Sequence, residues 1–328
     1  MSNLNEAGTM AGTMRAAFFY RYNFLLLFFF MVLALSGCSS IKPSTDTSAG
    51  RQLTAVTDEP THQYYPGKFI WHDLLTPERD KAKQFYGQLL GWTFKDDGNY
   101  SIIFNQDKKI GGIIEVKHNT EQKSEQNAEA IWLASMSIDN MDKAISVVQS
   151  HGGQILKGPV NMDNRGQGVL MSDPLGAHLI LLKAADGDPV DDEVRIGDWL
   201  WNEIWTHQPD KTLPFYTALA PYTSVSHSDG YHILKSQEKW RAGVRQTFAE
   251  KGKNKDSNKN TKVRWVPTIR VADPNTLLNK VEALGGRIVL HPGEHPSDDN
   301  TALIIDNTGA LLMLQSWDSQ VDEGAQSL

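Results

Sequence analysis

Residues 67–94 read GKFIWHDLLTPERDKAKQFYGQLLGWTF, and residues 197–225 read GDWLWNEIWTHQPDKTLPFYTALAPYTSV. The two stretches align at an offset of 130 residues, so that Trp71 matches Trp201, Asp73 matches Glu203, and Phe85-Tyr86 matches Phe215-Tyr216. Self-similarity at a fixed period is the signature of a repeated structural unit. The chain therefore contains two copies of one structural plan.

A second pair of segments, further along each copy, aligns at an offset of 133 residues. The matches are Trp132 with Trp265, Gly152-Gly153 with Gly285-Gly286, and Asp173-Pro174-Leu175-Gly176 with Asp306-Asn307-Thr308-Gly309. The duplication thus extends over the whole length of each copy. We place the first copy at residues 67–185 and the second at residues 194–317.

The hydrophobic pattern of each unit predicts a strand, a helix and then further strands. The first unit opens with a half-buried strand at Phe69–Leu75 and a helix at residues 78–90 that Gly91 ends. Strands follow at Tyr100–Phe104 and Ile110–Val116, around a turn at Lys108-Lys109. The second unit repeats the order, with a strand at 131–138, a helix at Met141–Ser150, and strands at Val169–Met171 and Ala177–Leu182. The prediction is an α+β fold with two βαβββ units per copy.

The first 37 residues have the pattern of a secretory signal peptide. An unbroken apolar run, Phe24–Leu35, follows Arg15 and Arg21 and precedes small residues, which matches the charged, apolar and cleavage regions of such signals. A membrane-spanning helix is the alternative, but it needs about 20 apolar residues. Arg21 and Asn23 interrupt the run on its upstream side. We therefore expect export and cleavage.

The run Leu35-Ser36-Gly37-Cys38 resembles the lipobox of bacterial lipoproteins. The resemblance implies that Cys38 carries the lipid that anchors the chain to a membrane, and that Ser39 directs it to the outer membrane. Two acyl chains or more give stable anchoring. We expect a lipid-anchored protein of the cell envelope that faces the periplasm. Residues 38–66 would be a flexible tether and residues 318–328 a tail.

Composition narrows the range of partners. The chain has a formal net charge of −7, and its one lysine-rich run, Lys251–Lys262, contains no aromatic residues. We therefore predict no nucleic acid partner and interpret that run as a solvated loop. Because the chain has a single cysteine, no internal disulfide forms and packing alone must hold the fold.

The repeated motifs occur together in one known superfamily. The strand and helix ending in Phe-Tyr, the Gly-Gly after the second helix and the closing Asp-Pro-x-Gly turn resemble the vicinal oxygen chelate superfamily, which includes glyoxalase I, bleomycin-resistance proteins and extradiol dioxygenases. The resemblance covers about residues 67–317. It implies four βαβββ modules in two tandem copies, forming cupped mixed β-sheets with flanking helices.

In metal enzymes of that superfamily, each copy has two kinds of ligand position. One is on the opening strand, fourteen residues before the Phe of Phe-Tyr, and the other is on the last strand, seven residues after the Asp of Asp-Pro-x-Gly. In this chain these positions are Trp71, Ile180, Trp201 and Met313. The first three cannot ligate a divalent ion, and the Met313 thioether suits only soft metals. We therefore predict no metal and no other cofactor, with a divalent metal held by other residues as the alternative.

Alternation along the opening strands groups the candidate binding residues. Trp71 and Asp73 share one face, and Trp201, Glu203 and Trp205 share the equivalent face of the second copy. If these faces line the cup, each copy offers aromatic rings and one acid to a small-molecule ligand. The alternative is that the tryptophans are core and that each acid pairs with a neighbouring basic or backbone group. His72 is one register away, so it should point to the helix side.

Three functions remain open from the sequence. The first is an anchored protein that binds a small molecule in an aromatic cup without the usual metal. The second is a lyase or dioxygenase-type enzyme acting on an envelope metabolite, with Asp73 and Glu203 as the weak candidates for general acid/base catalysis. The third is a structural module whose cup is filled by its own side chains.

Overall fold

The structure, a computed structural model, describes residues 53–116, 130–228, 230–247, 262–294 and 300–317. The signal peptide, Cys38 and the tail at 318–328 lie outside the described residues, so the predictions made for them remain predictions. In the described part of the chain, no helix combines the length and the apolar character needed to cross a membrane.

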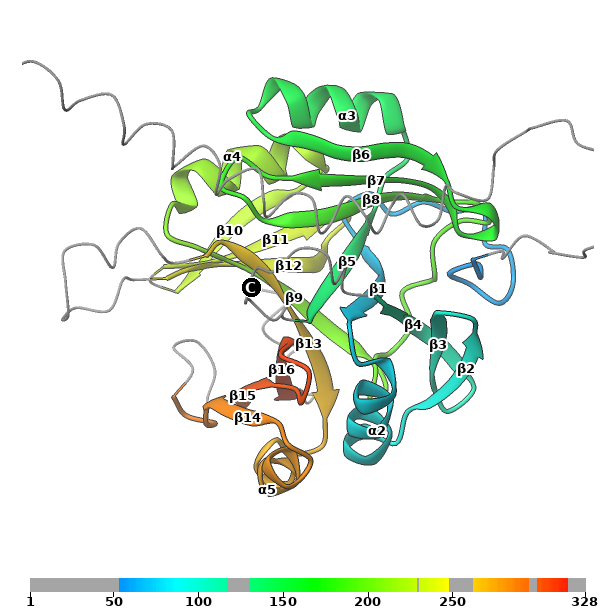
Figure 1. The fold of residues 1–328 in the computed structure, drawn as a ribbon. Helices are drawn as coiled ribbons and strands as arrows, with labels where there is room; N and C mark the ends of the chain where they lie inside the picture. Colours follow the sequence, from blue (N-terminus) through cyan, green and yellow to red (C-terminus); the bar gives the residue numbers. More distant parts are fainter. Residues whose placement is uncertain (1–52, 117–129, 229, 248–261, 295–299, 318–328) are drawn as a thin grey trace, which may run out of the picture.

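The first copy forms one eight-stranded mixed sheet, here sheet A, in the order β2-β3-β4-β1-β5-β8-β7-β6 (Figure 1). Its first module is β1 (Phe69–Thr76), α2 (Arg79–Leu90), β2 (Thr93–Asp97), β3 (Tyr100–Asn105) and β4 (Lys108–Glu115). Its second module is β5 (Ile131–Ser137), α3 (Met141–Ser150), β6 (Gln154–Asn161), β7 (Gly166–Ser172) and β8 (His178–Ala184). The two modules join through their opening strands, because β1 pairs with β5 in antiparallel fashion.

The second copy repeats this plan in sheet B, in the order β10-β11-β12-β9-β13-β16-β15-β14. Its third module is β9 (Trp199–Thr206), α4 (Pro209–Leu219), β10 (Thr223–Ser228), β11 (Tyr231–Ser236) and β12 (Lys239–Gln246). Its fourth module is β13 (Arg264–Val271), α5 (Asn275–Ala283), β14 (Arg287–Leu290), β15 (Thr301–Ile305) and β16 (Leu311–Ser316). The predicted α+β fold of four βαβββ modules in two tandem copies is confirmed.

One local prediction is corrected, and two strands were not predicted. The turn between β3 and β4 lies at Gln106-Asp107, where Gln106 has a φ of 55°, and Lys108 already pairs with Asn105. The strands β2 and β6 were not predicted individually. Both lie at the edges of sheet A, where β2 is largely exposed and β6 mostly half-buried, so their sequences lack the apolar alternation on which a prediction depends.

The Phe-Tyr and Asp-x-x-Gly motifs bind each other across the two copies. The hydroxyl of Tyr86 in α2 donates to Asp306 Oδ2 at 2.7 Å, and the hydroxyl of Tyr216 in α4 donates to Asp173 Oδ2 at 3.2 Å. Each tyrosine oxygen also accepts a hydrogen bond from an indole, Trp132 Nε1 at 2.9 Å for Tyr86 and Trp265 Nε1 at 3.0 Å for Tyr216.

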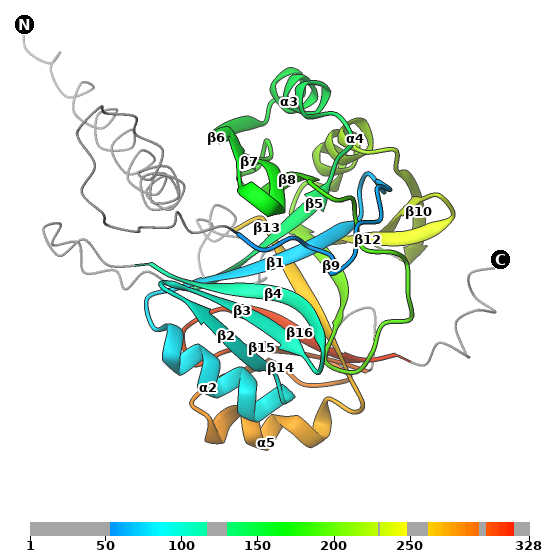
Figure 2. The ribbon, with the colours of Figure 1, turned by 90° about the vertical axis from the view of Figure 1, so that its right-hand side faces the viewer.

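The Gly-Gly motifs add close contacts between the same helices and turns of the two copies. A Cβ on Gly153 would lie 3.0 Å from the Phe215 ring, and a Cβ on Gly286 would lie 2.8 Å from the Phe85 ring. The absence of a side chain therefore lets each helix of one copy approach a turn of the other. As a result α3 lies beside α4, and α2 lies beside α5, as Figures 1 and 2 both show.

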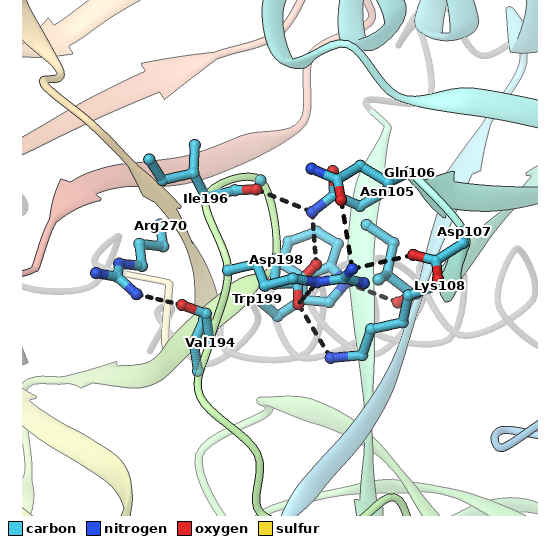
Figure 3. Close-up of polar contacts among 12 residues, drawn as sticks. Asn105, Gln106, Asp107, Lys108, Val194, Ile196, Asp198, Trp199 and Arg270 are labelled. Carbon is cyan, nitrogen blue, oxygen red and sulfur yellow. Dashed lines mark hydrogen bonds and ion pairs between the residues drawn. The ribbon is translucent and has the colours of Figure 1, made fainter.

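The start of the second copy is held against the β3–β4 hairpin (Figure 3). Asp198, only 3% exposed, accepts a hydrogen bond from Asn105 Nδ2 at 2.6 Å and lies 3.0 Å from Lys108 Nζ. Trp199 donates from Nε1 to the carbonyl of Ile110 at 2.7 Å. These contacts fix the start of the second copy on the first.

Residues 53–66, which the sequence pattern assigns to the flexible tether, instead pack along the first copy. Val56 is 5% exposed, the Thr61 hydroxyl donates to the carbonyl of Asp188 at 2.7 Å, and the Tyr65 N–H donates to Asp188 Oδ2 at 2.6 Å. The polar composition does not indicate a free tether here, because Thr61 and Tyr65 bond to the folded first copy. The rest of the predicted tether lies outside the described residues.

Candidate functional site

In each sheet, one face packs on the helices and on the other copy, and we call the opposite face the cup face. The sequence-predicted ligand positions lie on it in matching rows. In sheet A, Trp71 pairs with Ser135, which pairs with Ile180. In sheet B, Trp201, Thr268 and Met313 form the same row.

Neither row fits a divalent metal. The three side chains of each row supply an indole, a hydroxyl and an isoleucine or methionine side chain, whereas glyoxalase and dioxygenase chemistry needs carboxylate or imidazole ligands. Within the described ranges, no group of three or more His, Cys, Asp or Glu side chains lies close enough to hold a metal ion. The two rows therefore lack the ligands that this metal chemistry requires.

A closed network surrounds Asp73 on the cup face of sheet A. Asp73 Oδ1 accepts hydrogen bonds from Trp71 Nε1 at 3.0 Å and from the Tyr100 hydroxyl at 2.8 Å. Arg165 lies 3.4 Å from Asp73 Oδ2 through Nη1, and its Nη2 donates to Tyr100 at 2.9 Å. Burial raises the pKa of Tyr100, so its hydroxyl stays protonated. Trp71 and Asp73 thus meet as predicted, but inside a network that is already complete.

The chain itself covers this network. The Arg165 guanidinium lies over the Trp71 ring, 4.1 Å from its centre, and Arg165 Nε donates to the carbonyl of Thr54 at 2.9 Å. Leu53 and Val56 of the amino-terminal segment pack into the same cluster. Trp71 is consequently only 1% exposed. The first cup is filled by its own chain, which matches the alternative reading of its tryptophan as core.

The second cup uses the same residue types with a different arginine. Glu203 Oε2 accepts hydrogen bonds from Arg245 Nε and from Trp205 Nε1, both at 3.1 Å. Trp201 Nε1 donates to the Tyr231 hydroxyl at 3.0 Å, and the Arg245 guanidinium lies 4.2 Å from the centre of the Tyr231 ring. Each predicted acid is therefore paired with an arginine. Asp73 and Glu203 lie on the cup faces of different sheets, so they do not form one acid/base pair.

Each network lies directly over a glycine of the neighbouring strand. A Cβ on Gly112 would lie 1.9 Å from the Tyr100 hydroxyl and 2.6 Å from Asp73 Oδ1. On Gly243, at the matching position of the second copy, a Cβ would lie 2.4 Å from the Tyr231 hydroxyl. Both tyrosine hydroxyls thus occupy space that any other residue would fill.

The cup faces differ in exposure. Trp71 is buried, whereas Trp201, Trp205, Trp240 and Trp317 of the second copy are all partly exposed. Three of these form a chain of ring contacts, with centroids 6.3 Å apart for Trp201 and Trp240 and 6.2 Å apart for Trp240 and Trp317. Trp205 instead packs beside a small apolar cluster of Val266, Leu303 and Met313. The second copy therefore presents aromatic surface where the first presents none.

Residues 68–181 match the family model described as Glyoxalase/Bleomycin resistance protein/Dioxygenase superfamily. The match falls on the first copy, and the second copy repeats its strand order. This chain is a tandem glyoxalase-fold protein.

Two relatives align with most of this tandem glyoxalase-fold protein. The protein named "Putative glyoxylase CFP32" of Mycobacterium tuberculosis is 25% identical over 259 residues, which cover 76% of this chain and 94% of the relative. The anthracycline biosynthesis protein DnrV of Streptomyces peucetius is 21% identical over 257 residues, covering 71% and 88%.

Solved structures share the fold at lower identity. A Mn(II)-bound glyoxalase from Novosphingobium aromaticivorans matches with a TM-score of 0.55 and 13% identity, covering 77% of this chain and 83% of its own. An extradiol ring-cleaving dioxygenase from B. fuscum matches with a TM-score of 0.53 and 13% identity, covering 79% and 74%. At this identity the matches establish the fold and not the chemistry.

Several residues of the two networks were not predicted. Tyr100 and Tyr231 repeat at matching positions of the tandem glyoxalase fold and could have been found from the duplication. Arg245 could not, because the matching position of the first copy is Ile114. Arg165 reaches Asp73 from 92 positions away along the chain, a distance over which sequence spacing gives no signal.

A separate polar hollow of about 550 Å³ lies at the start of α4, on the helix side of sheet B. Its walls include His207, Ser226, His232 and Gln246. It lies on the opposite face of sheet B from the residues predicted for the cups, and its side chains make no metal cluster within the described residues. We therefore place the candidate site on the cup face of sheet B.

Proposed function

We propose that this tandem glyoxalase-fold protein is a lipid-anchored envelope protein that binds one small molecule on the cup face of its second copy, without a metal. The first copy acts as scaffold. The observation that carries the proposal is the contrast between the buried Trp71 and the partly exposed Trp201 at the same position of the duplicated fold. Exposed indoles lining one face are typical of sites for flat apolar ligands.

The residues at the metal positions support binding rather than metal-dependent catalysis. Trp71, Ile180, Trp201 and Met313 stand where the superfamily's enzymes place their ligands, and none suits a hard or borderline divalent ion. Relatives named for anthracycline biosynthesis support an aromatic ligand, because anthracyclines are polycyclic aromatic molecules.

The anchor is supported by the lipobox-like sequence before Cys38. Lipid on Cys38 would hold the folded copies at the membrane surface, facing the periplasm. Replacing Cys38 by Ser should move the protein from the membrane fraction to the soluble fraction and abolish incorporation of labelled palmitate. A Cys38→Ser protein that still sediments with membranes would exclude lipid on this residue as the anchor.

Ligand binding is tested on the mature lipoprotein purified in lipid nanodiscs. Aromatic, cationic and peptide-like compounds are screened for a shift in the unfolding temperature, and the metal content is measured on the same sample. A ligand at 100 times its Kd should stabilise the fold by about 2.7 kcal/mol without being converted. Stoichiometric Ni, Zn, Fe or Mn together with turnover would instead establish the lyase or dioxygenase alternative.

A further inference from the structure

The polar hollow on the helix side of sheet B is a second place where a ligand fits. Its walls are the start of α4, the strands β10 and β11, and the end of β12. Its volume of about 550 Å³ is within the range of sites that hold small molecules. Because it lies on the face of sheet B opposite the cup, it is separate from the site described above.

The duplicated fold shows what fills the matching place of the first module. There Arg79, at the start of α2, donates from Nη1 to the carbonyl of Gly98, which follows β2. Lys83 Nζ donates to Asp96 Oδ2 at 2.7 Å, and the Ser101 hydroxyl donates to Asp96 Oδ1 at 2.6 Å. The side chains of the first module thus bond to one another and to the β2–β3 turn.

Uncharged or small residues replace this set in the third module. Sequence offset and strand pairing match Arg79 with Pro209, Lys83 with Leu213, Asp96 with Ser226, and Ser101 with His232. In the same way Glu115, at the end of β4, is matched by Gln246 at the end of β12. A proline ring cannot extend to the next hairpin as the arginine side chain does. The space that the first module fills is therefore open in the third.

The replacing side chains keep hydrogen-bonding groups that the fold does not use. Within the described ranges, the side chains of Ser226, Ser228, His232 and Gln246 make no hydrogen bond to another group of the chain. A hydroxyl, a primary amide and a neutral imidazole each both donate and accept. All four residues are partly or fully exposed, so a ligand can take the place of the water that they bind.

The wall charges favour an uncharged ligand. Asp210 and Lys211 are the charged lining residues that the structure describes, and both are exposed. Their opposite charges offer no net counter-charge, so a charged ligand would give up hydration without compensation. Each hydroxyl of a sugar both donates and accepts, as the wall groups do. The Pro209 ring adds an apolar surface for the C–H groups of a sugar ring.

We propose that this hollow is a second binding site, and that its ligand is an uncharged, polyhydroxylated molecule such as a sugar ring. Ser226, His232 and Gln246 hold the hydroxyl groups of the ligand. The inference goes beyond the function proposed above and does not rest on it.

The test uses the full chain as it is isolated from cells, in nanodiscs if it carries lipid. Saturable binding of D-glucose, D-galactose, D-mannose and N-acetyl-D-glucosamine is measured by saturation-transfer difference NMR. We expect at least one of these sugars to bind. Ser226→Ala and His232→Ala should each weaken its binding about 3- to 10-fold. Ser224→Ala is the matched control, because Ser224 lies on the same exposed strand outside the walls of the hollow.

A variant that rebuilds the first module gives a second test. Pro209→Arg combined with Ser226→Asp restores the arginine and the acid that fill the matching place, so it should abolish sugar binding. Its unfolding temperature shows whether the fold is retained. Full affinity of this double variant for the sugar would place the ligand elsewhere and overturn the inference.

The remaining outcomes also decide the question. Absence of saturable sugar binding, or an affinity that Ser226→Ala and His232→Ala both leave unchanged, overturns the inference. Asp229, next to Ser228 in the sequence, lies outside the described residues, so methylguanidine is included as a cationic probe and inorganic phosphate as an anionic one. Tighter binding of either ion than of every sugar also overturns the inference. None of these failures bears on the cup of the second copy.

One further variant separates the two proposed sites. Sugar binding that Trp201→Ala abolishes and Ser226→Ala does not change would place the sugar on the cup face. That result overturns this inference and supports the function proposed above.

Discussion

His72 and Asn202 occupy the same position in the two copies, and their side chains hydrogen-bond to each other. His72 Nε2 donates to Asn202 Oδ1 at 2.9 Å, and the imidazole stacks on Trp199 with ring centres 4.1 Å apart. The other ring nitrogen, Nδ1, is buried without a partner. The duplicated opening strands therefore meet back to back at this pair, with the two cup faces turned away from it, as the sequence alternation predicted for His72.

This burial makes stability depend on pH. Loss of hydration lowers the pKa of His72 from 6.5 to about 4, so the folded state favours the neutral imidazole. The unfolded chain binds a proton first as the pH falls. The contribution of His72 to the free energy of unfolding should therefore be complete above pH 6.5. It should be lost as the pH falls from 6.5 to about 4, which lowers the free energy of unfolding by about 3 kcal/mol. Denaturant unfolding of the wild type and His72→Gln across this range measures the effect.

His72→Gln should show a shallower decrease, and an unchanged slope would contradict the assignment. Part of the decrease should persist in this variant, because burial also lowers the pKa of His178 to about 4. His151→Gln, at an exposed position, serves as the control and should follow the wild type.

The cross-copy tyrosines make a second prediction. Tyr86→Phe removes the hydroxyl that joins Trp132 to Asp306, leaving a buried indole N–H and a carboxylate oxygen without that partner. We expect a loss of about 1–3 kcal/mol in the free energy of unfolding, and a similar loss for Tyr216→Phe. The two sites are distinct, so the losses should add in the double variant. Tyr65→Phe should change stability little, because among the described residues the Tyr65 hydroxyl bonds to the exposed Gln63 alone. Equal losses for all three variants would argue against the cross-copy bonds.

The close approach of Tyr100 to Gly112 gives a third prediction. Gly112→Ala would place a Cβ 1.9 Å from the Tyr100 hydroxyl, so either the tyrosine or the strand must move. We expect destabilisation of at least about 1–3 kcal/mol, read from thermal unfolding. Gly87→Ala is the matched control, because it lies in α2 and its Cβ would meet nothing closer than 3.4 Å. It should be neutral or slightly stabilising. A Gly112→Ala protein as stable as the wild type would show that Tyr100 is free to reorient.

The fold could be predicted because its signals are local and occur twice. The period-2 alternation placed Trp71 with Asp73, and Trp201 with Glu203 and Trp205, on common faces, and the structure has them so. The hydrogen bonds between the Phe-Tyr motif of one copy and the Asp-x-x-Gly motif of the other could not be predicted, because Tyr86 and Asp306 are 220 residues apart in the sequence. The same holds for the filling of the first cup, which depends on Arg165 and on a segment whose composition resembles a tether.

The last prediction concerns the filled first cup. Arg165→Met leaves Asp73 buried without its cation, which should cost about 3–5 kcal/mol in the free energy of unfolding. Adding Asp73→Asn should recover part of this loss, because the second change removes the unpaired charge. A double-mutant cycle by denaturant unfolding measures the coupling. Lys83→Met breaks the pair between Lys83 and the exposed Asp96 and should cost no more than about 1 kcal/mol. Additive losses for Arg165 and Asp73 would mean that the arginine holds the first cup closed through its packing on Trp71 and Thr54, rather than through the acid.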